Sequence, residues 1–175
     1  MKNKYLVLII VTAMITMLVA CRKKDHNIGG SQTGWGYGMQ VKVDGTVTHF
    51  SDVTARWIDG GNYLEITGTN DGTEWISITI MSETTRVPTG QYSLDDGSAF
   101  TILSVYSHTD GNARMNYTAT RGTLAPEDAF VLHIDRINDE VEGSFSGSVV
   151  MVEGIRTLGI VTLEEGQFKA PIRPN

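Results

Sequence analysis

The chain has 175 residues and a formal net charge of -6, and 41% of its residues are hydrophobic and 8% aromatic. This length suits one domain with a sizeable core, and the composition is not that of a disordered chain. Its one Cys excludes a disulfide scaffold, its acidic excess disfavours nucleic-acid binding, and its one long apolar run excludes a multi-span channel.

The N-terminal segment has the layout of a signal peptide over residues 1–20. Lys2 and Lys4 make its start basic, and Tyr5 to Ala20 is an uninterrupted run of apolar and small residues. Spanning a bilayer takes about 20 apolar residues, so this run is short for a permanent anchor. A plain signal peptide with a chance Cys, or a signal anchor, remains an alternative.

The run ends at Leu18-Val19-Ala20-Cys21, which resembles the bacterial lipobox. This resemblance implies cleavage before Cys21, a diacylglycerol thioether on its sulfur and an acyl group on its new amine. Because residue 22 is Arg and not Asp, the resemblance also implies export to the outer membrane, with the leaflet left open. Residues 21–33 are expected to form a lipidated flexible tether, since Arg22 to Thr33 is polar, contains a Gly pair and shows no periodicity.

Residues 34–175 are predicted to form a single all-β domain, because apolar and polar residues alternate with a period of two. The intervening Trp75, Ser77 and Ser146 are expected on the solvent-facing side, and Leu158 and Ile160 share a face opposite Val161. The residues predicted to share the core face are Met39, Val41, Val43, Leu64, Ile66, Ile76, Ile78, Ile80, Phe130, Leu132, Ile134, Val141, Phe145, Val149 and Met151.

Short turn signals separate the predicted strands, and Gly, Asn and Asp at these places tolerate the positive φ of tight hairpins. Connections this short favour an antiparallel meander of about ten strands, folded as a β-sandwich or a flattened barrel. The longest connection is Gly122 to Asp128. The turn signals include Asp44-Gly45, Asn70-Asp71-Gly72, Asp110-Gly111, Asn138-Asp139, Glu153-Gly154 and Glu165-Gly166.

The sequence contains no recognisable catalytic or cofactor motif. His26, His49, His108 and His133 lack metal-ligand spacing, and no Gly-rich phosphate loop precedes a helix, so neither a metal nor another cofactor is expected. Paired carboxylates could hydrolyse glycosides, but all four pairs fall in predicted turns, where acids stabilise the backbone. These pairs are Asp95-Asp96, Glu127-Asp128, Asp139-Glu140 and Glu164-Glu165.

The aromatic residues offer a candidate binding face. By strand parity Trp75 lies opposite the Ile76 face, although Trp normally buries most of its area. Trp35 and Tyr37 share a parity near the tether, and Trp57 precedes a Gly-Gly turn. Exposed aromatic side chains stack on sugars or on partner proteins, whereas a covered second face would make them structural.

The C-terminal half resembles small Bacteroidota-type lipoproteins of unknown function. The matching segments are Thr89 to Tyr92, Gly143 to Gly147, and the C-terminal segment Val161 to Phe168, which ends in a Gly-x-Phe pattern. The resemblance implies an all-β domain on the bacterial cell envelope and supplies no catalytic residue.

These observations predict a cell-envelope lipoprotein held to the membrane by its N-terminal lipid, with a non-enzymatic binding or structural β domain. Its ligand would be a glycan, a small molecule or an envelope protein, and not a nucleic acid. The alternative is a lipid-anchored hydrolase that uses paired carboxylates. A concave site in which two carboxylates approach within about 5 to 10 Å would favour the alternative, and an aromatic-lined pocket without such a pair would favour binding.

Overall fold

A computed structural model describes residues 36–94, 96–119 and 128–174, all within the compact unit Gln32–Asn175. The predictions for the signal peptide, Cys21, the tether and Trp35 lie outside the described residues, as does most of the connection 122–128. No helix among the described residues is long and apolar enough to cross a membrane.

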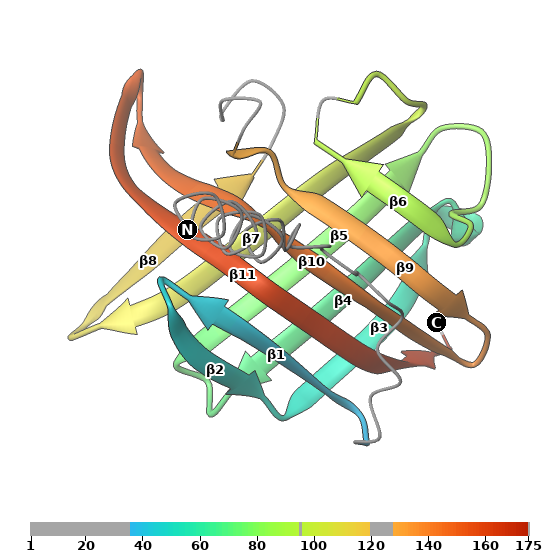
Figure 1. The fold of residues 1–175 in the computed structure, drawn as a ribbon, viewed down its shortest axis with the longest axis horizontal. Helices are drawn as coiled ribbons and strands as arrows, with labels where there is room; N and C mark the ends of the chain where they lie inside the picture. Colours follow the sequence, from blue (N-terminus) through green and yellow to red (C-terminus); the bar gives the residue numbers. More distant parts are fainter. Residues whose placement is uncertain (1–35, 95, 120–127, 175) are drawn as a thin grey trace, which may run out of the picture. The chain divides into compact units, whose positions relative to one another are not determined.

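The described residues form an eleven-stranded sheet, which confirms the predicted all-β class (Figure 1). One short 3-10 turn, η1 (Asp59–Gly61), joins β3 to β4. The strands are β1 (Gly38–Val43), β2 (Thr46–Phe50), β3 (Asp52–Ile58), β4 (Tyr63–Asn70), β5 (Glu74–Ser82), β6 (Gly90–Ser93), β7 (Phe100–Asp110), β8 (Ala113–Ala119), β9 (Val131–Ile137), β10 (Glu140–Glu153) and β11 (Arg156–Arg173).

The strand pairings close into a ring, which is the topology of a flattened barrel. The order β11-β3-β4-β5-β7-β8-β10 returns to β11, because β10 and β11 also pair with each other. Two short contacts complete the ring: Val150 of β10 pairs with Thr118 of β8, and the end of β11 pairs with β3 at Ala55 and Arg56. The β11–β3 contact is parallel, whereas the predicted meander contains only antiparallel neighbours.

The two longest strands also carry side branches. The first half of β10 pairs with β9, and β9 pairs with β6. The middle of β11 pairs with β1 from Leu163 to Lys169, and β1 pairs with β2. The β10–β11 hairpin therefore organises the domain, and its tip extends past these neighbours (Figure 1, upper left).

Turn chemistry explains most of the local connections. Asp44 and Gly45 adopt φ values of 47° and 80°, and Asp71 and Gly72 adopt 44° and 72°, which fits the tight hairpins predicted at both places. The turn predicted at Glu165-Gly166 is wrong, since β11 continues through it. Glu165 has a positive φ of 52° because it forms a bulge where the register against β10 shifts.

The period-two pattern places most of the core as predicted, although Val43 and Met151 are only partly buried. Ile76, Ile78 and Ile80 are fully buried along β5, and buried residues of β4, β9, β10 and β11 join them in one cluster. The expectation that Ser77 faces solvent is wrong, because this side chain is only 5% exposed. Its strand is central in the sheet, and the small hydroxymethyl group lies between Thr67 of β4 and Val105 of β7.

Candidate functional site: a polar depression at one end of the barrel

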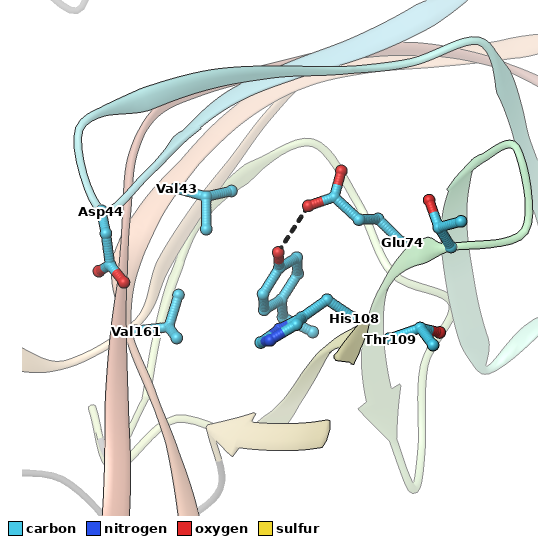
Figure 2. A pocket seen from close by; sticks show the side chains of 8 residues that line it. Val43, Asp44, Glu74, His108, Thr109 and Val161 are labelled. Carbon is cyan, nitrogen blue, oxygen red and sulfur yellow. Dashed lines mark hydrogen bonds between the residues drawn. The ribbon is translucent and has the colours of Figure 1, made fainter. Parts of the chain in front are cut away.

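The barrel has a polar depression of about 350 Å³ at one end, shown in Figure 2. The β1–β2 turn, the start of β5, the end of β7 and the middle of β11 bring its residues together. Its lining consists of Val43, Asp44, Thr73, Glu74, Tyr106, His108, Thr109 and Val161.

A hydrogen-bonded pair of a buried phenol and a half-buried carboxylate forms its inner wall. The Tyr106 hydroxyl donates a hydrogen bond of 2.8 Å to Glu74 Oε1, and Asn70 Nδ2 donates one of 3.4 Å to Glu74 Oε2. Tyr106 is only 3% exposed, so the phenol is held as a neutral donor. Burial raises its pKa above the ordinary value for tyrosine, and the hydrogen bond to Glu74 and the charges of Glu74 and Asp44 raise the pKa further.

His108 adds an aromatic layer. Its ring stacks on Tyr117 with a centroid separation of 5.7 Å and an interplanar angle of 15°, and it lies 5.7 Å from the Tyr106 ring. Its Nδ1 is buried and has no hydrogen-bond partner among the described residues. The side chain is half-buried, so part of the imidazole remains open to solvent at the depression.

Asp44 faces this wall from the opposite side of the depression (Figure 2). Its Oδ1 accepts a hydrogen bond of 2.8 Å from the Thr162 backbone N–H, while the Asp44 N–H donates to the Thr162 carbonyl at 2.9 Å. These bonds tie the β1–β2 turn to β11. A turn residue thereby becomes a fixed acceptor at the rim.

The chemistry of this depression suits neutral hydroxylated or cationic ligands. Two carboxylates, the hydroxyls of Thr73 and Thr109 and one imidazole line it, and none of its described lining residues is Lys or Arg. An anion would therefore meet like charge without a compensating cation. No group of three or more potential metal ligands occurs among the described residues.

A second depression of about 420 Å³ lies at the other end of the barrel, between the start of β4, the end of β5 and the start of β7. It includes Tyr63, Met81 and Ser82, and its only lining carboxylate among the described residues is Glu83. It lacks the phenol–carboxylate pair, so the first depression is the stronger candidate.

The structure does not gather the predicted aromatic face into one surface. Tyr37 is exposed beside Lys169, whose Nζ lies 6.0 Å from its ring centroid. Trp57 is half-buried at the core edge beneath Arg86, at 4.1 Å. Trp75 is half-buried on the face opposite Ile76, with Arg114 5.9 Å from its ring centroid.

The predicted carboxylate pairs do not build this depression. Glu140 contacts Arg136 and Lys169 on the outer surface, and Glu165 forms an ion pair of 2.7 Å with Lys42. Asp95 and Glu127 lie outside the described residues. The sequence does not indicate that Asp44 and Glu74 meet, because each has an ordinary turn explanation and they belong to hairpins that are separate in the sequence.

Comparisons with known proteins give no relative for this chain. No protein-family model matches it, and searches of curated proteins and of solved structures found no match.

Replacing Tyr106 with Phe should lower the free energy of unfolding by about 1 kcal/mol, since the half-buried Glu74 carboxylate loses its hydroxyl donor. It should also reduce the stability loss at alkaline pH. The raised Tyr106 pKa means that the unfolded chain releases this proton first, near pH 10, so folding stability decreases as pH rises beyond that. Urea unfolding from pH 8 to 12 would measure both effects. The control Tyr37→Phe, at an exposed position, should change neither the free energy of unfolding at pH 8 nor its decrease at alkaline pH.

Proposed function

We propose that this chain is a lipid-anchored protein of the bacterial cell envelope, held through Cys21 and carrying a ligand-binding β domain. The lipobox-like Leu18-Val19-Ala20-Cys21 supports the anchor, since the only Cys in the chain lies where cleavage and acylation would occur. Two or more acyl chains would hold the domain stably at a membrane. The outer membrane is the proposed site, because residue 22 is not Asp.

The observation that carries the binding role is the fixed polar wall of the depression. Glu74 is oriented by Tyr106 and Asn70, and Asp44 by Thr162, so acceptors are already positioned before a ligand arrives. Pre-positioned polar groups reduce the entropy lost on binding. Carboxylates that face each other beside the half-buried His108 ring are suited to the hydroxyls and an apolar face of a glycan, which we propose as the ligand class.

A hydrolase is the second candidate, because Asp44 and Glu74 line the same depression. Binding is the better proposal, since both carboxylates already accept hydrogen bonds that hold the fold together. If the protein released sugar from an envelope polysaccharide, and both Asp44→Asn and Glu74→Gln abolished this release, the hydrolase would be favoured instead.

Replacing Cys21 with Ser should abolish metabolic labelling by an alkyne palmitate and leave unprocessed precursor. The reason is that the hydroxyl cannot form the thioether that precedes cleavage in lipoproteins. Gel mobility and labelling of the two proteins in a lipoprotein-processing bacterium would test this. Equal labelling of the wild type and the variant would remove the anchor from the proposal.

A glycan array probed with residues 34–175 should show binding that falls by about ten-fold or more in Glu74→Gln, because a charged acceptor is lost from the wall. The matched control is Glu65→Gln, a carboxylate on β4 that pairs with Arg56 outside the depression. Equal loss in both variants would place the ligand elsewhere, and Trp75→Ala would then test the predicted aromatic surface.

A further inference from the structure

The tip of the β10–β11 hairpin concentrates exposed apolar side chains. Six large hydrophobic residues are exposed among the described residues, and four of them belong to this hairpin: Val152, Ile155, Leu158 and Ile160. Ile155 is completely exposed at the turn, and the other three are 48 to 59% exposed. We propose that this tip inserts into the surface of the lipid bilayer that carries the Cys21 anchor, an inference that rests on the proposed lipid attachment.

The tip of the β10–β11 hairpin extends beyond the strands that pair with it. The register against β1 ends at Leu163, and the contact with β8 is confined to Val150. Beyond these points β10 and β11 pair with each other as far as Glu153 and Arg156, and no other described strand pairs with them. Val152, Ile155 and Leu158 therefore lie on the two-stranded end of the hairpin, and Ile160 lies at its base, opposite Val150.

Charge along this arm favours a lipid surface. From Val149 to Leu163 the only charged residues are Glu153 and Arg156, which have opposite signs and face each other in register. The tip carries no net charge, whereas the chain as a whole carries -6. A tip with two charged residues of opposite sign costs less to bring to the headgroup boundary than a surface with a net charge.

The area of the exposed apolar patch also distinguishes a lipid surface from a protein partner. The four exposed aliphatic side chains offer on the order of 400 Å² of apolar surface, enough to mark an interaction site on a monomer. A stable protein partner or a second copy needs about 800 Å² on each side. A bilayer surface needs no matching shape, so a small protruding tip is sufficient.

The chain outside the described residues is long enough for this arrangement. Residues 22–35 lie between Cys21 and Gly36, and fourteen residues extend at most about 50 Å. Gly38 pairs with Lys169, and the fourteen residues of β11 from Lys169 back to Arg156 cover roughly 40 Å. The anchor and the hairpin tip can therefore reach one bilayer together, with the long strands lying along it.

The test uses the full-length lipidated protein in phosphatidylethanolamine–phosphatidylglycerol vesicles. Because Cys21 would be blocked as a thioether, Ile155→Cys provides a single thiol for an environment-sensitive nitrobenzoxadiazole probe. We expect its emission to shift to the blue on reconstitution and to be quenched by spin-labelled lipid. The matched control is Gln91→Cys on β6, an exposed position on an edge strand, whose probe should do neither.

Flotation of the same vesicles measures the anchor independently. Protein that floats while the probe at position 155 stays red and unquenched would overturn the tip insertion and leave the anchor intact. A blue shift that follows protein concentration without lipid would assign the tip to a second copy and also overturn the proposal. Failure to float would contradict the anchor and, with it, the insertion.

Discussion

Replacing Gly143 with Ala is expected to destabilise the domain by about 3 to 5 kcal/mol. A Cβ at this position would lie 2.1 Å from the His133 carbonyl oxygen and 2.8 Å from Phe168 Cζ. The first neighbour is backbone in β9 and cannot rotate away, and the second is a fully buried ring. The β9–β10 pairing must therefore open, at the position where its register shifts between Glu142 and Gly143.

The matched control is Gly159→Ala, at another glycine on a long strand. A Cβ there would approach only side chains, the Tyr117 ring at 3.2 Å from Cε1 and Met151 Cε at 3.8 Å, and a side chain can move by a few tenths of an ångström. We expect a change of less than about 1 kcal/mol for this variant. Urea unfolding would compare the two, and equal midpoints would disprove the close packing of β9 against β10 at Gly143.

Replacing Phe145 with Ala should destabilise the domain by about 3 to 5 kcal/mol, because it leaves a cavity at the centre of an aromatic cluster. Phe145 is 4% exposed and packs between Phe130 and Phe168, with ring centroids 5.9 and 6.4 Å away. Its ring also covers Gly166, where a Cβ would lie 2.7 Å from two ring atoms.

Two comparisons make the Phe145 result specific. Ile78→Ala, in the fully buried face of β5, should cost about 2 to 5 kcal/mol by the same mechanism. Ser146→Ala, next to Phe145 but exposed, should change stability by less than about 0.5 kcal/mol. If Ser146→Ala proved the worst of the three in chemical denaturation, the register of β10 would be wrong by one residue.

Predicting the candidate site from sequence was harder than predicting the strands. Asp44 carries an ordinary turn signal, and Glu74 follows the Asn70-Asp71-Gly72 turn, so local chemistry accounts for each carboxylate separately. Only the contact of the β1–β2 turn with Thr162, and of Tyr106 with Glu74, brings them to one depression. Nothing in the spacing of these residues along the chain indicates that they meet.

The sequence by itself determined the all-β class, most of the hairpin turns and the core parity, because period-two alternation and positive-φ turn residues act over a few neighbouring residues. Only the tertiary structure decided the parallel contact of β11 with β3, the branching of β1 and β9 from the long hairpin and the bulge at Glu165. The tertiary structure also decided that Leu158 and Ile160 face solvent although their alternation resembles that of core strands. The reason is that strand pairing and ring closure depend on contacts between residues far apart in sequence, which a local pattern does not encode.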